Sequence, residues 1–290
     1  MVNNLEILNK YLKNSENFMS AYGKHHLFKS NFLNIEEPMN SGIFVKSTIS
    51  TKIKEYISII PQLIIYKNEI FTNEYIKKYK KICSSQSRWF NLEMIIQGII
   101  LKILHDQRVL NGDVCTIGDG KAHFVYGVLD KQDVNKIFSV NLPQALIQDY
   151  LILKKFNSID ESLIKVVENE KDIEDEKCKL FLVPVQNKAF LNNKKIKLFV
   201  NSFSFQEMPL SETKKYIDIV VSNNAYLYSL NNEVKTMYDG EKINYNDFGI
   251  KKKGKIIFEK EAKFVKHYYN TNFPFIHKKK GKIISTLAKF

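Results

Sequence analysis

A glycine turn, Gly118-Asp119-Gly120, is the stretch whose residue types most clearly suggest chemistry. It follows the apolar run 114–117, and a helical pattern begins just after it. Glycines let the backbone approach a ligand closely, and the start of the next helix presents free N–H groups. Asn141 follows about 20 residues later, where nucleotide-binding folds place a group that holds a ribose hydroxyl. The pattern predicts a ligand pocket, although a turn without a ligand has the same signature.

Two side chains are candidates to take a proton from a reacting group. Glu207 follows the apolar run 196–200, and strands of an open α/β sheet point their carboxyl ends at the binding cleft. It could instead serve only as a favourable charge at the start of the helix after Pro209. His123 lies near the start of the helix after the glycine turn, where simple exposure to solvent is expected in preference to a contact with a ligand. Hydrogen-bonding candidates near the strand ends are Asn201, Ser202, Gln206 and Asn231, although Asn there is often only a turn former.

The elements that position these residues begin near residue 111. Apolar runs at 114–117, 137–140, 180–183, 196–200 and 225–230 alternate with helical patterns, which is typical of parallel strands joined by helices. The runs 255–258 and 264–269 then follow each other directly and are predicted to form a closing antiparallel pair. The fold class expected is α/β, with a Rossmann-like, doubly wound, mostly parallel sheet of about seven strands.

The regions around this sheet are less regular. Residues 1–110 are predicted to form a mainly helical extension or lid over the cleft, and residues 111–290 the sheet domain. The clearest helix of the extension is 87–104, which contains Trp89. The acidic stretch 157–177 is expected to be a long exposed connection with one set of helical turns, and Ser211 is expected to cap the helix that follows Pro209.

Composition sets limits on the function. Hydrophobic residues make up 44% of the 290 residues and charged residues 26%, so the chain is globular and not disordered. The net charge of +13 comes mostly from dispersed Lys, without an Arg-rich or aromatic-interleaved RNA motif, so nucleic acid is disfavoured. A polyanionic acceptor or a membrane surface is left open. Three isolated cysteines and the lack of a signal-peptide pattern suggest a cytoplasmic protein, and no apolar run is long enough to span a bilayer.

Three segments carry a family likeness. They are residues 117–120 after the first expected strand, 199–208 after the fourth, and 227–232 in the fifth. In these segments the chain resembles class I S-adenosylmethionine-dependent methyltransferases. It is most similar to bacterial proteins assigned as sugar O-methyltransferases, which are found among surface-polysaccharide genes. The segment Ser-Phe-Gln-Glu-Met at 204–208 is the most specific, and the likeness covers about residues 110–270.

The resemblance implies a reaction and a set of roles. The reaction is methylation of a sugar hydroxyl on a glycan or nucleotide-sugar precursor, with S-adenosyl-L-methionine as the cofactor. Glu207, or else His123, would be the base, and Gln206 and Asn231 would contact the acceptor. No His, Asp or Glu set is spaced as metal ligands, and a homo-oligomer is left open. The residues that would hold the cofactor are Ile117, Gly118, Asp119, Gly120, Asn141, Leu142, Asn201 and Ser202.

Three positions depart from the family pattern. An acidic residue usually stands at Thr116, a third glycine at Ala122 and another acidic residue at Asn141. An amide offers one acceptor oxygen and no charge, so cofactor binding at Asn141 is expected to be weaker than with a carboxylate. A non-catalytic Rossmann domain that acts as a partner or binding subunit is therefore the main alternative.

Two further alternatives are less well supported. Amino-group methylation of nucleic acid usually uses an Asn/Asp-Pro-Pro-aromatic segment where this chain has residues 201–204, which are Asn-Ser-Phe-Ser. A dinucleotide oxidoreductase would normally continue the alternation of strands and helices to the end of the sheet.

Overall fold

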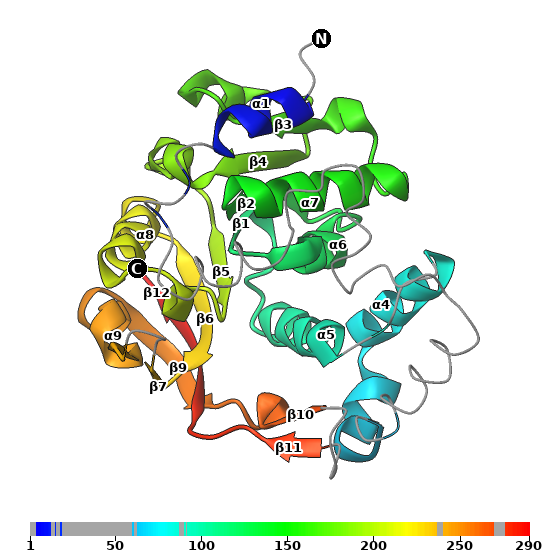
Figure 1. The fold of residues 1–290 in the computed structure, drawn as a ribbon, viewed down its shortest axis with the longest axis vertical. Coiled ribbons are helices and arrows are strands. Elements are labelled where there is room, and N and C mark those ends of the chain that lie inside the picture. Colours follow the sequence, from blue (N-terminus) through cyan, green and yellow to red (C-terminus); the bar gives the residue numbers. More distant parts are fainter. Residues whose placement is uncertain are drawn as a thin grey trace.

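The structure is a computed structural model that describes residues 4–12, 15, 18, 60, 63–86, 90, 92–236, 240–269 and 276–290. At its centre the described residues form an eight-stranded sheet with the order β3-β4-β2-β1-β5-β6-β12-β9 (Figure 1). All neighbours from β3 to β6 are parallel, while β12 is antiparallel to both β6 and β9. The strands are β1 (Gly112–Ile117), β2 (Val134–Asn141), β3 (Ile164–Val166), β4 (Leu180–Pro184), β5 (Leu198–Ser202), β6 (Tyr226–Asn232), β9 (Lys255–Glu261) and β12 (Ile283–Lys289).

Helices cover both faces of this sheet, as the continuous apolar character of its central strands requires. Figure 1 shows α8 (Leu210–Ser222) on one side and α5 (Leu92–Asp106), α6 (His123–Val128) and α7 (Pro143–Lys155) on the other. Alternate residues of a strand pack into separate hydrophobic cores on the two faces of the sheet. Val114 and Val200 pack with α5–α7, and Cys115 and Phe199 pack with α8. The predicted fold class, a doubly wound and mostly parallel sheet that ends in antiparallel strands, is confirmed.

The described helices of the N-terminal part pack into the same core. Helix α4 (Glu74–Ser85) contacts α5 and α6, and α1 (Asn4–Lys10) contacts α7 and β3. Residues 63–72 are also helical. The division of the chain near residue 110 stays a prediction. Within the described part of the chain, none of the helices has both the length and the apolar content needed to cross a bilayer.

The packing of α4 on α6 depends on Gly127. A methyl group added there would meet Leu101 and the Tyr79 hydroxyl, which donates a hydrogen bond to the backbone oxygen of His123 at 2.6 Å. We expect Gly127→Ala to destabilise the protein by about 1–3 kcal/mol, because an inserted methyl in a packed core forces neighbours apart. Chemical denaturation would measure this. Gly120→Ala is the control, because open space lies above Gly120 and little change in stability is expected; equal stability of the two variants would contradict the prediction.

Some predicted elements were wrong. The run 255–258 is part of β9, but its partner is β12 and not the run 264–269. Residues His267–Tyr269 form β10, which pairs with β11 (Ile276–Lys278) in a separate two-stranded sheet. The closing pair is therefore formed by β9 and β12, and β12 inserts between β6 and β9. Leu287 and Ala288 of β12 are completely buried. Because neighbouring residues of a strand face opposite sides of the sheet, both can be buried only where the sheet is covered on both faces.

The expected cap of α8 was wrong, the connection 157–177 contains a strand besides the expected turns, and one expected residue lies outside the described residues. Helix α8 begins at Leu210 with Pro209 at its N-cap, so Ser211 lies inside the helix and does not cap it. The stretch 157–177 contains the edge strand β3 and two 3₁₀ turns, held by the Asp160 side chain and by a capping box at Asn169. Helix α5 confirms the helix expected at 87–104 from Leu92 onward, and Trp89 lies outside the described residues.

Candidate functional site

A pocket of about 260 Å³ lies at the carboxyl ends of β1 and β5, between the glycine turn and α5. This is the edge at which open α/β sheets bind ligands. Among the predicted site residues it brings together Gly118, Asp119, Gly120, His123, Ser202 and Glu207. Its other lining residues are Glu93, Ile96, Gln97, Thr116, Lys121, Phe124, Val200 and Phe203.

The glycine turn has the backbone shape that its sequence predicts. Gly118 has a φ of +75°, and a side chain there would run into Ser204, whose hydroxyl donates a hydrogen bond to the backbone oxygen of Ile117 at 2.7 Å. The Gly118 N–H donates to the Val140 oxygen at 2.8 Å, so the turn lies against the end of β2, beside Asn141. The two predicted contact points for a nucleoside are therefore neighbours in space.

The Asp119 side chain binds the first turn of α6, whose N-cap is Ala122. Its two carboxyl oxygens accept hydrogen bonds from the backbone N–H groups of Phe124 and Val125 at 2.8 and 2.9 Å. Burial raises the pKa of Asp119 to about 7, although these hydrogen bonds oppose the shift. At neutral pH this carboxyl is therefore close to its midpoint, and a nearby positive charge would ionise it.

Glu207 reaches the pocket from the loop after β5. Its side chain is more than a third exposed, and one of its oxygens lies 3.6 Å from the Lys235 ammonium. Burial raises the pKa of Glu207, while Lys235 lowers it. A carboxylate with a raised pKa is a stronger base, which suits the removal of a proton from a hydroxyl group.

His123 and Glu93 also line the pocket. The His123 Nδ1 atom lies 3.9 Å, and the Lys121 ammonium 3.2 Å, from the same Glu93 oxygen. Burial favours the neutral form of Glu93, but Lys121 and His123 outweigh it and lower its pKa. The His123 side chain is almost fully buried, so the expectation of simple solvent exposure was wrong.

The predicted residues Asn201, Gln206 and Asn231 are buried and serve the loop that carries Glu207. Asn201 donates to the Ile117 oxygen at 3.2 Å and accepts from the Asn231 amide at 2.9 Å. Gln206 accepts from the backbone N–H of Asn232 at 2.7 Å. These bonds tie the end of β6 and the glycine turn to the loop, so the three side chains position the site.

Asn141 and Leu142 lie outside this pocket, at the end of β2. The Asn141 side-chain oxygen accepts from the Leu142 N–H at 2.9 Å. Nearby, the N-terminal segment crosses the carboxyl ends of β2 and β4. Gln144, which follows β2, donates to the Ser15 hydroxyl at 2.7 Å, and Gln186, which follows β4, donates to the Tyr11 oxygen at 3.1 Å.

Sequence reasoning missed Gln97, which comes from α5. Its amide oxygen is buried without a hydrogen-bond donor among the described residues, and it lines the pocket. A buried acceptor of this kind requires a donor, and a ligand with an ammonium group would supply one. The signal that could have revealed it is a single amide side chain within the apolar run 94–101. No cluster of three metal-ligating side chains occurs in the described ranges.

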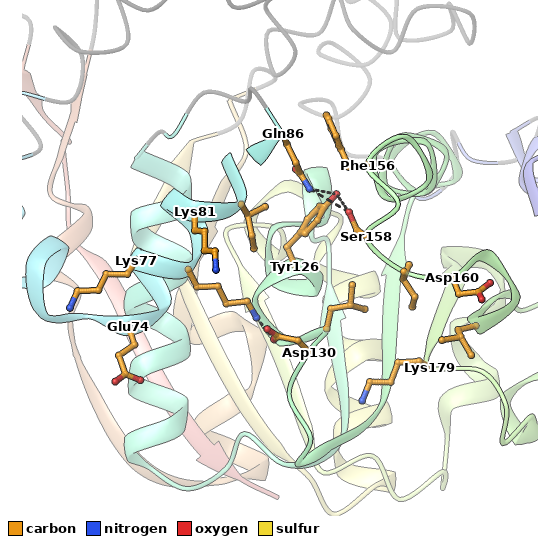
Figure 2. A pocket seen from close by; sticks show the side chains of 15 residues that line it. Glu74, Lys77, Lys81, Gln86, Tyr126, Asp130, Phe156, Ser158, Asp160 and Lys179 are labelled. Atoms are coloured by element: carbon orange, nitrogen blue, oxygen red, sulfur yellow. Dashed lines mark hydrogen bonds and ion pairs between the residues drawn. The ribbon is translucent and has the colours of Figure 1, made fainter. Parts of the chain in front are cut away.

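A larger hollow of about 860 Å³ lies elsewhere, between α4, α6 and the end of α7. Figure 2 shows Gln86, Tyr126 and Ser158 joined by hydrogen bonds on its wall. Lys179, which also lines it, stands immediately before β4, so this hollow lies towards the amino ends of the strands. It contains no glycine turn, and we place the candidate site in the smaller pocket.

Comparisons with known proteins identify similar folds. No family model matches the sequence, and no curated protein matches it. Among solved structures, a S-adenosylmethionine-dependent methyltransferase from Clostridium acetobutylicum shares 13% identity over 67% of this chain and 90% of its own, with a TM-score of 0.41. The methyltransferase domain of bacterial CtHen1 shares 9% identity over 69% of this chain and 100% of its own, with a TM-score of 0.43.

A third solved structure contains a bound cofactor product. M. capricolum TrmK, in complex with S-adenosyl-homocysteine, shares 9% identity over 63% of this chain and 66% of its own, with a TM-score of 0.35. Because these identities and TM-scores are low, we base the function on the strand order and on the residues of the pocket.

Proposed function

We propose that the chain is a S-adenosyl-L-methionine-dependent methyltransferase that acts on a hydroxyl group of a sugar, in a glycan or nucleotide-sugar precursor. The observation that carries this proposal is the meeting of Gly118, Gly120 and Glu207 in one pocket at the carboxyl edge of the sheet. The insertion of antiparallel β12 between β6 and β9 supports it, because a dinucleotide oxidoreductase would normally continue with parallel strands. A cytoplasmic location, a role in polysaccharide synthesis and a homo-oligomer remain predictions.

The residues around the glycine turn fit this cofactor. Space is open above Gly120, and the backbone of Gly118 can be approached closely. The Gln97 oxygen would accept from the ammonium of the cofactor's methionine part, and Asn141 would bond its ribose. Asp119, which lines the pocket, would supply negative charge near the sulfonium. The departures at Thr116 and Ala122 leave the turn intact, since Ala122 adopts the left-handed φ of +54° that a glycine would favour.

The cofactor supplies the electrophilic methyl group, and the chain positions the acceptor. Glu207 would accept the proton of the attacking hydroxyl, which contributes about 10²–10⁴-fold to the rate of such steps. Lys235 favours the ionised form of this carboxylate and so opposes the effect of burial. The hydrogen bonds of Asn201, Gln206 and Asn231 fix the loop, because a base is effective only in the correct geometry.

One observation favours a non-catalytic binding subunit as the second candidate. The pocket of about 260 Å³ is smaller than most ligand pockets, which range from about 300 to 1,000 Å³. Tyr11 and Ser15 hold the N-terminal segment across the ends of β2 and β4, beside the place proposed for the nucleoside. Binding of the whole cofactor would require this segment to move away from the ends of β2 and β4.

Calorimetric titration with S-adenosylmethionine tests the proposal. A cationic sulfonium favours the ionised form of Asp119, whose pKa in the free protein is about 7. Below that pKa a proton must leave on binding, so affinity should rise by up to about tenfold per pH unit from about pH 6 and level off by about pH 8.

The proton can be followed directly. Titrations in buffers of different ionisation enthalpy should show proton release at pH 6 and much less at pH 8. Asp119→Asn, whose folding would be checked by its melting temperature, should lose this proton release. Protons that the cofactor's own amine releases would still appear with this variant, so it serves as the control. No binding at millimolar cofactor would end the methyltransferase proposal. Binding that releases the same number of protons from both proteins would instead remove Asp119 from the sulfonium site.

A further inference from the structure

Lysines surround the mouth of the candidate site. Lys121 lines the pocket, Lys235 is the ion-pair partner of Glu207, and Lys279 follows β11. The Lys279 ammonium lies 4.7 Å from the centre of the Phe203 ring, which itself lines the pocket. Three separate parts of the chain, α6 with its turn, β7 (Val234–Thr236) and the β10–β11 pair, thus bring positive charge to one place.

Two of these three lysines already face a carboxylate, and the third does not. Glu93 is shared by Lys121 and His123, and Glu207 lies beside Lys235. Lys279 makes no ion pair with any carboxylate among the described residues. Burial lowers the pKa of Lys279, Lys235 lowers it further, and Glu93 opposes these effects with a smaller influence. Two lysine ammonium groups that repel each other at a partly buried site are a suitable place for an anion.

Phe203 provides a second observation. Its φ of +67° is rare for an aromatic residue, and such backbone strain is concentrated at binding and active sites. The backbone N–H of Phe203 donates to the Leu230 oxygen at 2.7 Å, which holds the residue in this conformation. Its ring therefore faces both the pocket and the Lys279 ammonium, so an acceptor that meets the ring would also meet the charge.

We propose that Lys279 and Lys235, with Phe203 between them and the pocket, form an anion subsite that binds the phosphate group of the acceptor. This inference rests on the proposed function, and it makes the acceptor a phosphorylated sugar or a nucleotide sugar instead of a neutral glycan. Both sources have the same phosphate chemistry. The ring of Phe203 would pack against the apolar face of the sugar while the lysines hold the phosphate.

Inorganic phosphate is the probe, because its binding needs neither cofactor nor turnover. Phosphate titrations of the full chain at constant ionic strength, followed by ³¹P NMR line broadening, should show saturable binding. Lys279→Gln and Lys235→Gln should each weaken it by about tenfold or more, as expected for loss of a charge-assisted hydrogen bond. Lys280→Gln is the matched control, because it removes the same charge from an exposed neighbour and should change nothing.

Lys279→Arg distinguishes loss of the charge from a change in structure. It keeps the charge and should bind phosphate nearly as well as the original protein. Non-saturable binding, or equal weakening in the Lys280 and Lys279 variants, would overturn the subsite. Competition with phosphate by glucose 6-phosphate but not by glucose would indicate that the acceptor is a sugar phosphate. Stronger competition by uridine diphosphate glucose would indicate a nucleotide sugar. Failure of both compounds to compete would also overturn the subsite. Cofactor binding without phosphate binding would reject the subsite alone, whereas phosphate binding without cofactor binding would reject only the methyltransferase function.

Discussion

Replacing Glu207 by Gln should lower kcat for methyl transfer by about 10²–10⁴-fold, because the amide cannot accept the proton of the attacking hydroxyl. Affinity for S-adenosylmethionine should change little, because this carboxylate would contact the acceptor and not the cofactor. The rate would be measured at saturating cofactor with a panel of sugar phosphates and nucleotide sugars. A radiolabelled methyl group provides the sensitivity needed for the slow variant.

The dependence of this rate on pH gives an independent readout. Burial raises the pKa of Glu207 above its ordinary value, so the base is protonated and inactive at low pH. The rate of the original protein should rise with pH through that raised pKa, and the Gln variant should lack the rise. Glu233→Gln is the control, because Glu233 is a nearby exposed carboxylate. An unchanged kcat in the Glu207 variant would show that another group takes the proton, with His123 the first candidate in the same pocket.

Asn141→Asp should strengthen the binding of S-adenosylmethionine by about tenfold. The amide at the end of β2 has one acceptor oxygen, whereas a carboxylate can accept from two ribose hydroxyls with roughly twice the strength per bond. The side chain already accepts from the Leu142 N–H, and a carboxylate can keep that bond. Isothermal titration calorimetry of the two proteins would measure the difference.

The control for added negative charge is Asn193→Asp. Asn193 is exposed and has a φ of +58°, which Asp tolerates, and it lies near Ser222 at the end of α8. This variant should leave cofactor affinity unchanged. Equal or weaker binding by Asn141→Asp would mean that the ribose does not lie at the end of β2. The subunit alternative would then gain support, because the N-terminal segment at Tyr11 and Ser15 would be closing a site that has no nucleoside.

Much of the site follows from local sequence. The glycine turn, the run before it and the loop that carries Glu207 can each be read from short stretches, since strand ends and turns have local signatures. Their meeting in one pocket also follows, because parallel strands bring their carboxyl ends to the same edge. The buried positions of Asn201 and Asn231 did not follow, because an Asn at a strand end looks the same whether it faces a ligand or another side chain.

What the sequence by itself determined is therefore the set of parallel strands, the helices between them and the turn at Gly118. Only the tertiary structure decided the partner of β9, the burial of His123, the position of Gln97 in the pocket and the contact of Lys279 with Phe203. The physical reason is that periodicity and turn chemistry act over a few residues. The insertion of β12, and the packing of α5 and the β10–β11 pair beside the sheet, depend instead on surfaces distant in sequence, which meet only when the whole core is formed.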